Sequence, residues 1–128
     1  MTHSNTPAPE SPAELTTAGL FLTRHLTRYI SKRVADSPAR ALSPNLVGHQ
    51  RKPALRIDVN AEDELAARLH DYHSGKFAYI EYFGEESLDD PHLDLTGRSG
   101  TFALADAVDG TDLVERGLSN WCTAVVFF

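Results

Sequence analysis

Apolar residues recur at helical spacing in two stretches of the first half of the chain. The first stretch follows Ser11-Pro12-Ala13-Glu14, a capping box with proline at the first helical position, and ends before Ser37-Pro38. The second begins at Asn60, carries acids in its first turn and closes at Gly75. Their apolar positions are Leu15, Leu22, Leu26, Tyr29, Ile30 and Val34, then Leu65, Leu69 and Tyr72. The pattern predicts two amphipathic helices, each burying one face.

After Gly75 the spacing changes to short runs of β-forming residues separated by turns. Strands are predicted over 77–83, 101–105 and 120–128. A polar loop is predicted over 87–99, and a short helix over 110–116 that Gly117 closes. The order of elements predicts an α+β (layered α/β) fold, in which an N-terminal helix pair packs on a mainly antiparallel sheet.

The domain organisation follows from composition shifts along the chain. Residues 1–12 contain three prolines and no apolar period, which predicts a disordered tail, and residues 13–128 are expected to form the N-terminal part of one domain. The segment 37–53 is a long irregular connection. The last strand ends on Val125-Val126-Phe127-Phe128, and a strand this apolar needs neighbours on both faces. We therefore expect further chain, beyond residue 128, to pack against it.

Composition and charge narrow the function classes. The single cysteine excludes an internal disulfide framework, and the sequence has no apolar run of about 20 residues. Residues 1–12 lack a basic start followed by an apolar run, so no secretory leader is expected. A cytoplasmic protein with no membrane association is expected. The net charge is −6, and 15 of the 18 acids lie between Asp58 and Glu115. Such an acidic half repels nucleic acid, and it can handle phosphate only after cations neutralise it.

Two acidic segments are placed where strands are predicted to end. Gly84-Glu85-Glu86-Ser87 follows one strand, and Asp106-Ala107-Val108-Asp109-Gly110-Thr111 follows the next. Magnesium prefers carboxylate and carbonyl oxygens together with water and substrate phosphate. A helix that opens at Gly110-Thr111 offers free N–H groups to an anion. Each segment alone is typical of a solvated surface or a turn, but together they indicate a magnesium and phosphate site.

These two segments resemble the paired signature of the inositol monophosphatase and fructose bisphosphatase superfamily. Members read Gly-Glu-Glu and then Asp-Pro-x-Asp-Gly-Thr or Ser, and Ala107 stands at the proline position. Ile57-Asp58-Val59 with Glu62-Asp63 is also similar to the segment before the second helix of fructose bisphosphatases. The resemblance spans about residues 54–128. It implies the first half of a sugar-phosphatase (αβαβα) fold.

The resemblance also implies a role for each matching residue. Glu85, Asp106, Asp109 and the backbone carbonyl of Val108 would bind Mg²⁺, with Glu86 as a further ligand. Thr111 and Glu85 would orient the attacking water, and Glu62 would stand behind Thr111. Asp109 and the N–H groups of Gly110 and Thr111 would receive the substrate phosphate. The implied activity is hydrolysis of a small phosphorylated metabolite, a sugar or inositol phosphate, by a phosphoric monoester hydrolase, and a homodimer is among the expected assemblies. The 128 residues alone are expected to lack turnover, because the later metal ligand and the sugar contacts of the family lie beyond them.

Other interpretations of these residues are weaker. Asp-x-Asp-Gly-Thr phosphatases of the haloacid dehalogenase type would require their nucleophile at Ala107, and an EF-hand would require alternating acids. His70 and His73 fit an exposed helix face better than a zinc site, and Trp121 and Cys122 are expected in the core. A non-catalytic relative that binds metal or a partner chain remains the alternative to an enzyme.

Overall fold

The computed structural model describes residues 11–44, 55–85 and 100–128. The predictions for the tail at 1–10, for the connection at 45–54 and for the polar loop at 87–99 lie outside these residues, as does Glu86.

The first predicted helix is confirmed as α1, Pro12–Asp36. The backbone N–H of Glu14 donates to Ser11 Oγ (3.2 Å), so the predicted capping residue satisfies one of the free donors of the first turn. The buried stripe of α1 consists of Ala18, Leu22, Leu26 and Ile30. A four-residue helix that the sequence did not predict, α2 (Pro38–Ala41), follows directly, with proline again at its first position.

The second long helix, α3 (Arg56–Gly75), begins four residues earlier than predicted. The reason is local, because the Leu55 backbone N–H donates to Asp58 Oδ2 (2.8 Å) and this acid caps the first turn. Ile57 and Ala61 extend the buried stripe toward the N-terminus. At the other end Tyr72, His73 and Ser74 leave helical geometry, so the regular helix ends before Gly75, which takes φ +88° at the last position of α3. The element ends at Gly75 as predicted, but the glycine does not itself terminate the helical backbone.

Three strands form one sheet in the order β1-β2-β3. They are β1 (Glu81–Gly84), β2 (Phe102–Asp109) and β3 (Cys122–Phe127), and α5 (Thr111–Glu115) connects the last two. β1 and β2 are parallel whereas β2 and β3 are antiparallel, so the sheet is mixed and the prediction of a mainly antiparallel sheet was wrong. β1 starts later than predicted because residues 75–80 form successive turns. β2 runs on past Ala105 to Asp109, so both aspartates of the second motif lie in the strand and not after it.

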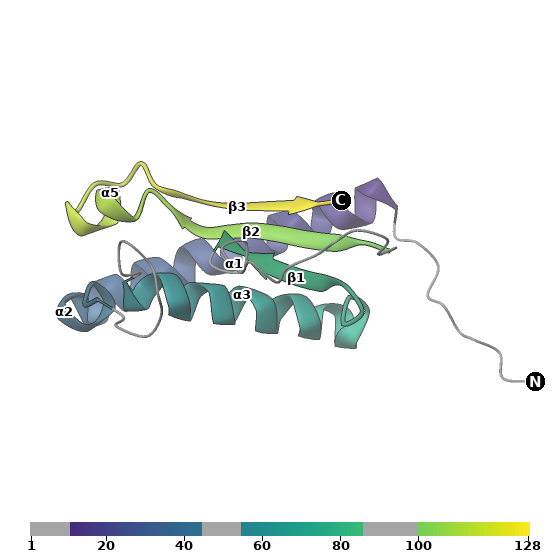
Figure 1. Cartoon of the computed structure of the whole chain (residues 1–128), viewed down its shortest axis with the longest axis horizontal. Coiled ribbons are helices and arrows are strands. Elements are labelled where there is room, and N and C mark those ends of the chain that lie inside the picture. The colour runs from purple at the N-terminus through teal and green to yellow at the C-terminus, as the bar shows by residue number, and fades with distance from the viewer. Residues whose placement is uncertain (1–10, 45–54, 86–99) are drawn as a thin grey trace, which may run out of the picture.

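The fold is α+β in two layers, with α1 and α3 side by side on one face of the sheet (Figure 1). Small buried residues of β2, Ala103, Ala105 and Ala107, let the helices approach the sheet closely. The parallel strands β1 and β2 point toward the end of the molecule where α5 and the start of α3 lie (Figure 1). No helix in the described part of the chain has the length and apolar content to cross a membrane.

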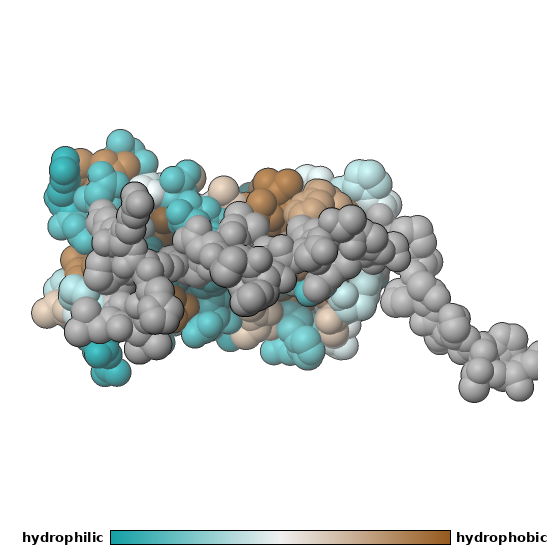
Figure 2. Space-filling model, viewed as in Figure 1, coloured by the Kyte–Doolittle hydropathy of each residue, from teal (hydrophilic) through white to brown (hydrophobic). Residues whose placement is uncertain are grey.

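The opposite face of the sheet carries aromatic side chains. The rings of Phe83 and Phe102 lie 6.0 Å apart, and those of Phe102 and Phe128 lie 5.6 Å apart. Val126 and Phe128 are 56% and 55% exposed, and Figure 2 shows hydrophobic surface gathered over this strand. Among the described residues, β3 is therefore covered on one face only.

Trp121 and Cys122, which were both expected in the core, differ in their exposure to solvent. Trp121 is half-buried and packs on the core, whereas Cys122 is exposed. The prediction for Cys122 was wrong because β3 alternates, with Thr123, Val125 and Phe127 turned inward and the even-numbered residues outward.

Candidate metal and phosphate site

The parallel pairing of β1 and β2 brings the two acidic motifs together. Gly84 pairs with Ala105, so the next position on each chain places Glu85 beside Asp106. Leu104 lies two positions before Asp106 and pairs with Phe83, so alternation along β2 puts Asp106 on the sheet face away from the helices. Glu85 follows the last residue of β1 directly. Residues 21 positions apart in sequence thus become neighbours at the carboxyl ends of two strands.

A β-bulge turns Asp109 to the same face as Asp106. In a regular strand, residues three positions apart point to opposite faces. Here Asp106 pairs with Ala124 and Asp109 with Cys122, so β2 holds one residue more than β3 across this interval. The burial pattern breaks at the same place, since Ala107 and Val108 are both buried. The bulge is the local feature that allows an Asp-x-x-Asp spacing to place two carboxylates together.

Thr111 follows a sharp turn and contacts an acid from α3. Gly110 has φ +93°, which glycine adopts without strain, so β2 passes directly into α5. Thr111 Oγ1 lies 2.7 Å from Asp58 Oδ1 and 3.1 Å from the carbonyl oxygen of Val108. The Leu55 N–H holds the second oxygen of Asp58, which fixes the carboxylate. No role was predicted for Asp58 from the sequence, although Ile57-Asp58-Val59 is part of the resemblance.

Glu62 lies against β1. The structure places no hydrogen bond between Glu62 and Thr111, and a Cβ added at Gly84 would overlap the Glu62 carboxylate. Asp58 and Glu62 are one helical turn apart on the same side of α3. Because α3 begins before Asn60, Asp58 is the acid that reaches Thr111, and Glu62 occupies the space left by the missing side chain of Gly84.

The acids of this region influence one another electrostatically. Burial raises the pKa of the Asp106 carboxyl, and the neighbouring charges of Asp109 and Asp58 raise it further. Burial also raises the pKa of Tyr82, with added contributions from Glu62 and Asp106. The Tyr82 hydroxyl is buried and has no hydrogen-bond partner in the described part of the chain. A cation near Asp106 would relieve this accumulation of negative charge.

Cys122 stands beside the second aspartate of the motif. Its Sγ lies 3.7 Å from Asp109 Oδ2, a distance at which the thiol donates to the carboxylate. Burial and the charge of Asp109 raise the pKa of the thiol, so Cys122 stays protonated near neutral pH. The contact orients Asp109.

The donor set suits a hard cation, although its side chains are not closed around a point. Glu85, Asp106 and Asp109 offer carboxylate oxygens, and Val108 offers the carbonyl that faces Thr111. Within residues 11–44, 55–85 and 100–128, no three His, Cys, Asp or Glu side chains converge closely enough to hold a metal ion. The backbone thus places Asp106 and Asp109 on one face of β2 and Glu85 just after the end of β1. The three side chains would have to turn toward one another to bind an ion together.

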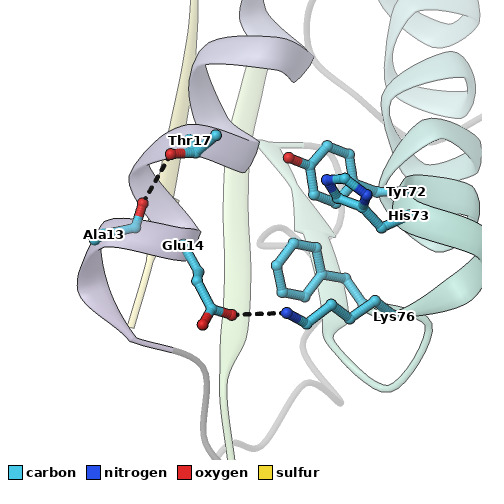
Figure 3. A pocket seen from close by; sticks show the side chains of 7 residues that line it. Ala13, Glu14, Thr17, Tyr72, His73 and Lys76 are labelled. Carbon is cyan, nitrogen blue, oxygen red and sulfur yellow. Dashed lines mark hydrogen bonds and ion pairs between the residues drawn. The ribbon is translucent and has the colours of Figure 1, made fainter.

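A pocket of about 230 Å³ lies at the far end of the helix layer, between the start of α1 and the end of α3. Figure 3 shows an ion pair between two of its lining residues, Glu14 and Lys76, whose charged atoms lie 2.9 Å apart. The Tyr72 ring stacks on Phe77 at 5.1 Å. His70 and His73 are on the α3 segment as expected, but His73 has φ +46° and the two do not share a regular helix face. These contacts fasten the two helices together.

Comparisons with protein-family models, with curated proteins and with solved structures give no match to this chain.

Proposed function

We propose that this chain is the N-terminal part of a Mg²⁺-dependent phosphatase with the layered fold of the inositol monophosphatase and fructose bisphosphatase superfamily. Its substrate class is a small sugar or inositol phosphate, and the reaction is attack of water on a phosphate monoester. The contact of Thr111 with Asp58, next to Asp106 and Asp109, is the observation that carries the proposal.

The acids of β1 and β2 would hold the metal. Glu85, Asp106 and Asp109 supply carboxylates, and Val108 supplies a carbonyl oxygen. Bound magnesium would neutralise phosphate charge and make water a better nucleophile. The raised pKa of Asp106 supports this assignment, because a carboxyl buried among other acids gains most from a nearby cation.

Thr111 would orient the attacking water. Its hydroxyl donates to Asp58, which leaves the oxygen lone pairs free to accept a hydrogen bond from water. As water loses a proton to Thr111 Oγ1, the threonine proton can pass to Asp58 Oδ1 over 2.7 Å. Asp58 thus takes the place behind Thr111 that the sequence resemblance gave to Glu62, and Glu85 remains the second acid near the water.

The turn at Gly110 would receive the phosphate. The N–H groups of Gly110 and Thr111 lie at the start of α5, directly after Asp109 in the chain. With several carboxylates close by, phosphate binding must depend on the metal.

A second candidate is a non-catalytic module that binds metal or a partner chain. The uncovered apolar face of β3, with Val126 and Phe128 exposed, favours it. The phosphatase requires the metal site and requires Thr111 and Asp58 to act on water. A module that binds a partner chain through β3 requires neither.

Terbium luminescence tests the proposed site. Trp121, the one tryptophan of the chain, packs against Gly110 and can sensitise Tb³⁺ held by Asp109. We expect emission that Mg²⁺ displaces and that Asp109→Asn abolishes. Inositol monophosphate or fructose bisphosphate should alter the emission of the metal-loaded protein, and Thr111→Ala should leave Tb³⁺ binding intact. Emission that persists in Asp109→Asn would refute the assignment.

A further inference from the structure

A second polar pocket lies on the other side of the start of α3. It has a volume of about 270 Å³ and lies where the last turn of α1, the short helix α2 and the first turn of α3 meet. Its polar lining comes from Arg33, Asp36, Ser37, Arg40 and Asn60, and Ile57 lies at its base. It shares no lining residue with the candidate metal site.

The hydrogen-bond donors of this pocket have no partners in the described part of the chain. The guanidinium groups of Arg33 and Arg40, the Ser37 hydroxyl and the Asn60 amide make neither a hydrogen bond nor an ion pair there. Arg33 is held over the ring of Tyr29, 5.0 Å from its centroid, which orients the guanidinium without using its donors. Four side chains that can donate thus line one pocket.

The charge of the pocket is positive. Asp36 is its one acid, and its carboxylate already accepts from Lys32 Nζ at 2.6 Å. Arg33 and Arg40 thus bring two positive charges to a pocket whose one acid is paired with Lys32. An anion with several acceptor oxygens would balance these charges and satisfy the planar donor forks of the arginines.

The volume sets the size of the anion. Pockets for drug-sized ligands span about 300–1,000 Å³, so 270 Å³ suits a compact ligand and not a nucleotide. We propose that this pocket binds a phosphate group, as inorganic phosphate or as a compact phosphate monoester, through Arg33, Arg40, Ser37 and Asn60. The site is separate from the proposed phosphatase site and does not depend on it.

Calorimetric titration of the full 128-residue chain with inorganic phosphate tests the proposal. Excess EDTA removes any metal-dependent binding, and the ionic strength is held constant. Arg33→Gln and Arg40→Gln should each weaken binding about tenfold, since each removes charge-assisted hydrogen bonds. Arg28→Gln, which removes an exposed arginine of α1 outside the pocket, should have no effect, and neither should Asp109→Asn. Glycerol 3-phosphate in place of phosphate distinguishes the two sources, since tighter binding of the ester identifies a metabolite and equal binding identifies free phosphate.

Three results would overturn the proposal. They are a lack of saturable binding by the wild-type chain, equal weakening by Arg28→Gln, and loss of binding in Asp109→Asn. Thermal melts check that each variant folds. Arg33→Lys serves as a second variant, because it keeps the positive charge and removes the planar guanidinium. Undiminished binding by both Arg33→Lys and Arg33→Gln would show that Arg33 does not contact the anion.

Discussion

Thr111 Oγ1 and Asp58 Oδ1, 53 positions apart in the sequence, lie 2.7 Å apart and join the start of α5 to the start of α3. The same carboxylate accepts the Leu55 N–H through its other oxygen. Asp58 therefore caps one helix and holds the first residue of another. These two contacts fix the Asp58 carboxylate in position. The proposed proton transfer from Thr111 to Asp58 requires such a fixed acceptor.

Two substitutions at Thr111 distinguish the contribution of its hydroxyl to stability from that of its side-chain volume. Thr111→Ala is expected to lower the free energy of unfolding by about 1–2 kcal/mol, because Asp58 loses a donor in a half-buried position. Thr111→Ser keeps the hydroxyl and should lose less. Chemical denaturation measures both, and Mg²⁺ affinity should be equal in the two variants. A Thr111→Ala protein as stable as Thr111→Ser would show that the contact contributes nothing.

Gly84 is expected to tolerate no side chain while Glu62 is present. Gly84→Ala would overlap the Glu62 carboxylate, and the forced shift should cost about 1–3 kcal/mol. Adding Glu62→Ala should recover most of this loss, whereas Glu62→Gln, which has the same shape, should not. A double-mutant cycle of thermal melts gives the coupling energy. Additive effects would mean that Gly84 and Glu62 do not share this space.

Asp106 should make stability depend on pH in the sense opposite to an ion-paired acid. Its pKa is raised above the ordinary value of 3.8, so the folded state binds the proton more tightly than the unfolded state. The contribution of Asp106 to the free energy of unfolding is therefore fully present below pH 3.8, and it is lost as the pH rises through the raised pKa. In EDTA, Asp106→Asn should therefore melt higher than wild type at neutral pH, with the gap closing in acid. A variant that melts lower at neutral pH would contradict the raised pKa.

Glu64 should show the usual acid dependence. Its hydrogen bonds with His25 and Arg68 lower its pKa below the ordinary 4.5, and it links α1 to α3 through a His25 Nε2 contact of 2.8 Å. The stabilisation is present above 4.5 and is lost as the pH falls through the lowered pKa. Glu64→Gln should cost about 1 kcal/mol at neutral pH and nothing in strong acid. Glu115→Gln, at an exposed acid of α5, serves as the control in the same melts.

The helices were predictable because their signals are local. Ser11 and Glu14 fixed the start of α1, and apolar spacing fixed its buried face. The start of α3 was predicted too late, because Asp58 was interpreted as an acid that precedes the helix. In the structure Asp58 caps the first turn of α3. The exposure of Cys122 follows from the alternation of β3 and from coverage of only one face of that strand by the described residues, and the predicted all-apolar strand did not distinguish the two faces.

The sequence could indicate the residue types of the candidate site but not their geometry. The motifs indicated Glu85, Asp106 and Asp109, yet the parallel pairing of β1 with β2 brings Glu85 near Asp106, and the bulge before Asp109 puts the two aspartates on one face. Neither the strand pairing nor the bulge can be predicted from a single sequence. The choice between Asp58 and Glu62 depends in turn on where α3 begins.

Titration of the chain with Mg²⁺ in a calorimeter tests the central claim most directly. Wild-type protein should bind the ion saturably, and Asp106→Asn and Asp109→Asn should each weaken binding about tenfold or more, because each removes a charged ligand. Glu115→Gln, which removes an exposed acid outside the site, should bind as wild type does. Equal Mg²⁺ affinity in wild type, Asp106→Asn and Asp109→Asn would contradict the assignment of the metal site and, with it, the phosphatase proposal.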